Sequence, residues 1–142
     1  RLVLPHHGCA MTAIYEDRAM ADKVVEKLRV YAQPQRLMIL SCLLRGERTV
    51  SEIEAATAIG QPALSQQLAE LRRGELVKTR REAKQVYYDL VDDQVALCVR
   101  SMEAIFSGAV SSVSDLATAI AEPSKVNPVA PAGAAAFARI ER

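Results

Sequence analysis

Residues 59–90 read IGQPALSQQLAELRRGELVKTRREAKQVYYDL and combine one helix pattern with a pair of strand patterns. The first half carries apolar side chains at the i, i+4, i+7 spacing of an amphipathic helix, namely Leu64, Leu68 and Leu71. Gly74 ends this helix pattern. Two apolar-edged runs follow, 76–79 and 85–90, on either side of a charged middle. The segment therefore predicts a helix followed directly by a β-hairpin.

Three further helices are predicted upstream. The first covers 20–32, and the second covers 34–46, since it begins with a proline at the first helical position and ends at a glycine. The third is short and ends by residue 60. We expect Ser51 to cap its N-terminus, because Glu54 completes an S-x-x-E capping box with it.

A longer helix is expected after the hairpin. It starts at Asp92 and runs past Phe106, with an apolar stripe from Val95 onward that Val113 and Leu116 continue. The two ends of the chain lack helical periodicity, and the C-terminal end is rich in Pro and Ala. We therefore expect an N-terminal tail over 1–12, one folded domain over 13–122 and a flexible tail over 123–142.

The composition is that of an ordinary folded protein. Of the 142 residues, 50% are apolar and 25% charged, and 18 basic against 17 acidic residues leave a net charge of +1. An anionic partner would have to meet a local basic patch, because the chain as a whole is nearly neutral. No apolar run reaches the roughly 18 residues that cross a bilayer, and no secretory signal is recognisable, so we expect a cytoplasmic protein with no membrane partner.

The common catalytic and metal-binding patterns are missing from the sequence. His6 and His7 are its only histidines and lie side by side near the N-terminus, which excludes a histidine-based zinc site or catalytic triad within the fold. The sequence also has no glycine-rich phosphate loop. We therefore expect no enzyme activity, no cofactor and no metal ion.

Two short helices in tandem, followed by a basic hairpin, are typical of a winged helix-turn-helix, whose second helix enters the major groove of double-stranded DNA. A glutamine amide on that helix can pair with both hydrogen-bonding groups of adenine. We expect base contacts from Gln61, Ser65, Gln66 and Gln67. We expect phosphate contacts from Arg72, Arg73, Lys78, Arg80, Arg81 and Lys84.

The basic hairpin is a local patch, because residues 61–88 hold those six cations against three acidic residues. A glutamine-rich helix face or a charged hairpin, taken alone, would be interpreted equally well as ordinary solvated surface. The order of the elements favours DNA binding.

Residues 59–90, together with AQPQRLMILSCLLRGE at 32–47, resemble the helix-turn-helix and wing of the ArsR/SmtB family of repressors. The similarity covers about residues 20–107 and is strongest to the branch that contains BigR, HlyU and NolR. The resemblance implies a mainly α fold with a β-hairpin wing. It also implies a homodimer that pairs through its first and last helices and binds an inverted repeat in promoter DNA.

A homodimer is also expected from the residues themselves. The last helix has a long apolar stripe and no further helix to cover it, so a second copy is the simplest cover. The alternative is that this helix folds back onto its own domain.

Cysteine and histidine positions bear on the signal that such a regulator would sense. The family's metal sites need cysteines in the third helix or histidines in the last, and both are missing. The branch's two sensor cysteines correspond to Ser41 and Ser107 here, and serine cannot form a disulfide. Redox or reactive-sulfur control is the leading hypothesis, with Cys42 and Cys98 as its candidate thiols. The simpler interpretation, which the pattern favours, is that both cysteines are small buried side chains on apolar stripes.

Two alternatives remain. The chain could be a NolR-like regulator without a thiol switch, or a helical protein-interaction module that does not bind DNA.

Overall fold

The computed structural model describes residues 11–121. It forms the predicted winged helix-turn-helix, mainly α-helical with a β-hairpin wing. The predicted tails lie outside the described residues, apart from residues 11 and 12. In chain order, the elements are η1 (Ile14–Glu16), α1 (Arg18–Tyr31), α2 (Pro34–Leu44), β1 (Arg48–Thr49), α3 (Val50–Thr57), α4 (Ala63–Arg73), β2 (Val77–Glu82), β3 (Gln85–Leu90), α5 (Asp93–Phe106) and α6 (Val113–Ala121).

Side-chain caps set where α1 and α5 begin. The Asp17 carboxylate accepts a hydrogen bond from the Met20 amide at 3.0 Å, and the Asp92 carboxylate accepts one from the Val95 amide at 3.0 Å. Each cap satisfies one of the amides that a helix leaves unpaired at its start.

The short helix α3 begins earlier than predicted. Thr49, not Ser51, is its N-cap: the Thr49 hydroxyl accepts from the Glu52 amide, and the Glu52 carboxylate accepts from the Thr49 amide. Two overlapping Ser/Thr-x-x-Glu patterns compete in this sequence. Pairing of β1 with β3 holds Thr49 in the extended conformation that a cap requires, which selects the first pattern.

The wing is a three-stranded antiparallel sheet in the order β1–β3–β2. Strands β2 and β3 pair from Val77 opposite Leu90 to Glu82 opposite Gln85, so β2 extends further than the predicted run 76–79. Strand β1 was not predicted, since two residues are too few to produce a pattern.

One apolar core joins α2, α3, α4, α5 and the base of the wing. The predicted stripe of α4 is buried, and α2 contributes the side chains at the centre. The largest fully buried side chains are Ile39, Leu40, Leu43, Ile53, Leu64, Leu71 and Leu76.

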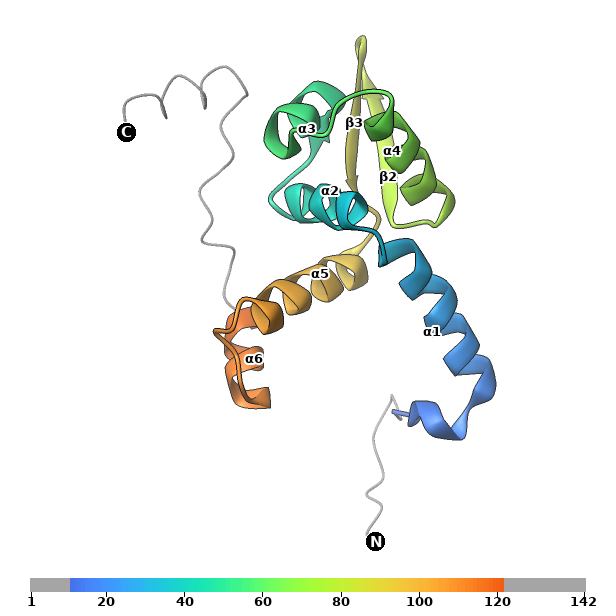
Figure 1. Cartoon of the computed structure of the whole chain (residues 1–142), viewed down its shortest axis with the longest axis vertical. Coiled ribbons are helices and arrows are strands. Elements are labelled where there is room, and N and C mark those ends of the chain that lie inside the picture. The colour runs from blue at the N-terminus through green and yellow to red at the C-terminus, as the bar shows by residue number, and fades with distance from the viewer. Residues whose placement is uncertain (1–10, 122–142) are drawn as a thin grey trace, which may run out of the picture.

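The prediction of one long last helix was wrong. Helix α5 ends at Phe106, and Gly108 has φ +85°, a left-handed conformation that glycine adopts readily. Val113 and Leu116 therefore lie on a separate helix, α6, which packs against α5 (Figure 1).

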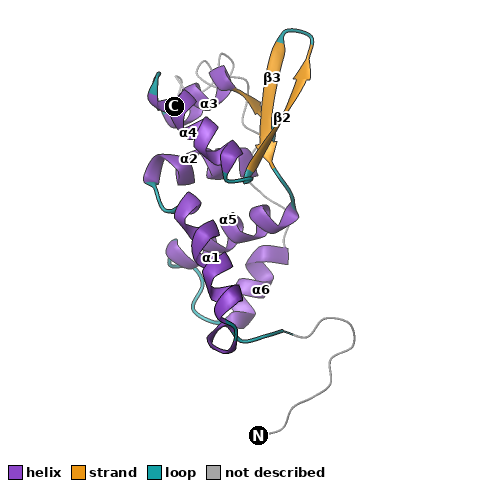
Figure 2. Ribbon diagram, turned by 90° about the vertical axis from the view of Figure 1, so that its right-hand side faces the viewer, coloured by secondary structure: helices purple, strands orange, loops and turns teal. Residues whose placement is uncertain are grey.

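Most helices and strands lie toward one or the other of two ends of the molecule. Figure 2 shows the wing with α3 and α4 at one end of the molecule, and α1 with α5 and α6 at the other. Within residues 11–121, no helix is both long and apolar enough to span a membrane.

Candidate nucleic-acid interface

Helix α4 presents a polar face opposite its buried leucines. Gln61 and Ser65 are exposed at its start and Gln66 is exposed one position further on, whereas Gln67 is half-buried. Three of the four side chains expected to read bases are thus exposed at the surface.

Gln61 and Ser65 are tied to each other. The Gln61 carbonyl oxygen, Oε1, accepts hydrogen bonds from the Ser65 amide at 3.1 Å and from the Ser65 hydroxyl at 2.7 Å. The side chain of Gln61 thereby caps the first turn of α4 and holds its own amide group at the exposed end of the helix.

Gln67 turns toward the body of the protein. Its Oε1 accepts a hydrogen bond from Arg36 Nη1 of α2 at 3.3 Å. This contact fastens α4 to α2, and it distinguishes Gln67 from its exposed neighbour Gln66.

The cation in the middle of the wing is already paired. Arg80 donates from Nη2 and Nε to the Glu47 carboxylate at 2.8 and 2.9 Å, and it also pairs with Glu82. Its guanidinium lies 4.6 Å from the centre of the Tyr87 ring. The hydrogen bond from Arg80 lowers the pKa of Glu47, and the hydrogen bonds that Arg80 donates to Glu47 and Glu82 raise the pKa of Arg80.

The other expected phosphate ligands fall into two groups. Arg73 forms an ion pair with Glu70 on the same helix. The remaining four are exposed and form no ion pair within the described part of the chain; they are Arg72, Lys78, Arg81 and Lys84.

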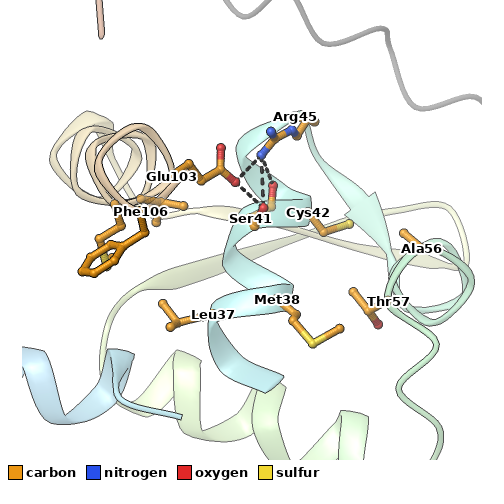
Figure 3. A pocket seen from close by; sticks show the side chains of 11 residues that line it. Leu37, Met38, Ser41, Cys42, Arg45, Ala56, Thr57, Glu103 and Phe106 are labelled. Carbon is orange, nitrogen blue, oxygen red and sulfur yellow. Dashed lines mark hydrogen bonds and ion pairs between the residues drawn. The ribbon is translucent and has the colours of Figure 1, made fainter. Parts of the chain in front are cut away.

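A second feature lies between α2, α3 and α5, where the structure has a pocket of ≈ 700 Å³ (Figure 3). On its wall, the Ser41 hydroxyl donates to Glu103 Oε2. Arg45 Nη1 donates to the same oxygen at 2.6 Å and contacts the Ser41 hydroxyl at 3.1 Å. This cluster was not predicted from the sequence. Ser41 was noted only as the position of a family sensor cysteine, and Glu103 lies 62 residues away and belongs to no recognisable motif.

Ser107 does not belong to this cluster. It is exposed at the C-terminal end of α5, and its hydroxyl donates to the carbonyl of Ala104 at 3.0 Å.

The two described cysteines have different surroundings, and both thiols are free. Cys42 is half-buried on the pocket wall, and burial raises its pKa, with Arg48 and Arg45 acting in the opposite direction. Cys98 is exposed, so the prediction that both cysteines are buried was wrong for Cys98. The buried stripe of α5 contains Val95 and Val99, and Cys98 lies beside it.

Metal ligands are not grouped in the part of the chain that the structure describes. No three His, Cys, Asp or Glu side chains between residues 11 and 121 lie close enough together to hold a metal ion.

Comparisons with known proteins point to a bacterial family. A family model described as "Bacterial regulatory protein, arsR family" matches residues 33–79. The chain is 46% identical to the biofilm growth-associated repressor of Agrobacterium fabrum over 86 residues, which cover 61% of this chain and 74% of that protein.

Solved structures show the same likeness. The crystal structure of the transcriptional repressor BigR from Xylella fastidiosa superposes with a TM-score of 0.62 at 38% identity, over 67% of this chain and 97% of BigR. A homodimeric winged helix-turn-helix DNA-binding domain from Mycobacterium bovis superposes with a TM-score of 0.58 at 29% identity, over 73% of this chain and 93% of that domain.

Proposed function

The chain belongs to the ArsR family of bacterial regulatory proteins, and on that premise we propose how it contacts DNA and how it dimerises. It is a DNA-binding transcription regulator, as its relatives are. We propose that it represses by occupying an inverted repeat in a promoter as a homodimer.

One observation carries the DNA-binding proposal: the exposed polar face of α4 lies at the same end of the molecule as the basic wing (Figure 1). Gln66 reads a base edge in the major groove, with Gln61 and Ser65 beside it at the helix start. The four uncompensated cations described above contact phosphates.

Three other residues that were expected to contact DNA have structural roles in this proposal. Gln67 fastens α4 to α2, and Arg80 braces the wing against Glu47. Arg73 is neutralised by Glu70 on its own helix. These side chains position the DNA-contacting surface, while the unpaired cations supply the attraction to phosphate.

The proposed dimer interface lies on the first helix and the last long helix. Apolar side chains are exposed along both, at the end of the molecule away from the wing (Figure 2), and a second copy would cover them. They include Val25 and Leu28 of α1, and Leu97 and Ile105 of α5. A two-fold dimer would place two recognition helices about one turn of DNA apart.

The test is binding to the DNA upstream of its own reading frame, compared with a shuffled duplex of the same composition. Specific, salt-sensitive binding supports the proposal. Binding that is equally weak for both duplexes contradicts it and favours a protein-interaction module. Control through Cys42 or Cys98 stays a prediction.

A further inference from the structure

The pocket between α2, α3 and α5 has the size and lining of a small-molecule site. Its ≈ 700 Å³ lies within the roughly 300 to 1,000 Å³ of known ligand pockets. Most of its wall is apolar, formed by Leu37, Met38, Val99, Met102 and Phe106. Flexible methionine and aromatic side chains form favourable contacts with aromatic rings, so this wall suits an aromatic body.

The polar part of the wall is small and electrically balanced. Arg45 and Glu103 form an ion pair, with Ser41 hydrogen-bonded to both. Their side chains are 22% and 33% exposed, so both are partly withdrawn from water. A charged ligand would leave one charge of this cluster without a partner, which is costly at a partly buried site.

The cluster can still donate one hydrogen bond and accept another. Within residues 11–121, the hydrogen bonds of this cluster use Glu103 Oε2 and Arg45 Nη1, which leaves Glu103 Oε1 to accept and Arg45 Nη2 to donate. A hydroxyl group is small and uncharged, and it both donates and accepts at a single atom, so it matches this pair.

We propose that this pocket binds an uncharged aromatic compound that carries a hydroxyl group, a phenol in the broad sense. The ring system packs among the apolar side chains, and the hydroxyl donates to Glu103 while it accepts from Arg45. Figure 3 shows the polar cluster on one side of the pocket and Met38 and Thr57 on the other.

A ligand at this position also bears on DNA binding, an effect that rests on the proposed function. Ala56 and Thr57 of the pocket wall belong to α3, the helix before the recognition helix, and Val99 and Met102 belong to α5. Occupancy therefore favours one placement of α3 relative to α5. We expect it to change DNA affinity by at least about fivefold, the lower end of typical allosteric coupling.

The first experiment measures binding of 2-naphthol to the full 142-residue chain by the fluorescence of the naphthol. The chain has no tryptophan, so the naphthol can be excited without tryptophan fluorescence from the protein. Two analogues separate the contribution of the hydrogen bond from the effect of ligand charge. One is 2-methoxynaphthalene, which cannot donate a hydrogen bond, and the other is 2-naphthoate, which carries a negative charge. Each should bind about tenfold more weakly than 2-naphthol, the value of one good hydrogen bond.

Two alanines on α3 give a matched pair of variants. Both are exposed, but Ala56 lines the pocket and Ala55 does not. Ala56→Phe should abolish 2-naphthol binding by filling the pocket, and Ala55→Phe should leave it unchanged. Glu103→Gln should reduce the preference for 2-naphthol over 2-methoxynaphthalene while both still bind. Far-ultraviolet circular dichroism checks that every variant is folded.

The outcomes separate this proposal from the proposed function. No 2-naphthol binding, or binding unaffected by Ala56→Phe, overturns the site, whatever the protein does with DNA. Equal binding of all three naphthalenes overturns the assignment of a phenol. DNA binding measured without naphthol tests the proposed function alone. Naphthol binding with unchanged DNA affinity overturns the coupling.

Discussion

Arg80 and Tyr87 are cross-strand partners in the wing, and the Arg80 guanidinium lies 4.6 Å from the centre of the Tyr87 ring. The same guanidinium pairs with Glu47, which precedes β1. Arg80 thus joins two strands and the loop before the third, and its charge is balanced within the fold. Its neighbour Arg81 is exposed and unpaired among the described residues.

This difference predicts different salt dependences for two neighbouring arginines. Arg81→Ala should weaken binding to all DNA sequences and reduce the slope of log affinity against log salt by about two for the homodimer, because each of the two protomers loses one phosphate contact. Arg80→Ala should change this slope less, since two acidic partners already offset its charge. Fluorescence anisotropy titrations at several salt concentrations measure both slopes. A larger change in slope for Arg80→Ala would contradict the assignment.

Two adjacent glutamines should differ in what their replacement changes, DNA affinity for one and stability for the other. Gln66→Ala should cost about 1 to 3 kcal/mol of binding per protomer on the correct operator and little on shuffled DNA, because each protomer loses a base contact. Gln67→Ala should instead lower the free energy of unfolding by about 1 kcal/mol, since its bond to Arg36 holds α4 on α2. Binding titrations on both duplexes and urea unfolding distinguish the two. Equal losses on both duplexes for Gln66→Ala would refute base reading.

The sequence predicted the α4 face well because the signal is local. The leucines of α4 are buried at the spacing that the sequence shows, and Gln66 lies on the opposite side as expected. Gln67 could not be distinguished from Gln66 in this way. Its half-buried position depends on Arg36, which lies 31 residues earlier and on another helix.

Other errors have the same origin in contacts between distant segments. Thr49 rather than Ser51 caps α3 because β1 pairs with β3, and a two-residue strand leaves no pattern. The pocket is formed by three helices that meet only in the folded chain. Cys98 was expected to be buried, but the pattern could not show which side of the α5 stripe faces away from the core.

The dimer proposal predicts the effect of one charge on α1. Leu28 is 52% exposed, and Leu28→Glu should convert the dimer to monomer at micromolar concentration, because the carboxylate would be buried without a partner. Ala55→Glu, an exposed change on α3, should leave the dimer intact. Sedimentation velocity measures the mass of each variant. A Leu28→Glu dimer of unchanged stability would place the interface elsewhere.

Packing of α1 on the end of α4 predicts a steric effect at Gly74. A Cβ atom there would lie 2.6 Å from Cγ1 of Val30. Gly74→Ala should therefore lower the free energy of unfolding by about 1 to 3 kcal/mol, as overpacking does. The double variant with Val30→Ala should recover part of that loss, because the clashing methyl groups are gone. Thermal or urea unfolding of the unmodified chain, the two single variants and the double variant forms a double-mutant cycle. Strictly additive losses of stability would contradict the clash.

The most direct test of DNA recognition is an affinity measurement for the upstream duplex and its shuffled control at 50 and 200 mM salt. Each of two protomers has four cations that are unpaired among residues 11–121. They predict that affinity falls by about 10³ to 10⁵ between these concentrations, with the upstream duplex bound more tightly at both. An affinity that is the same for both duplexes and barely changes with salt would contradict the account.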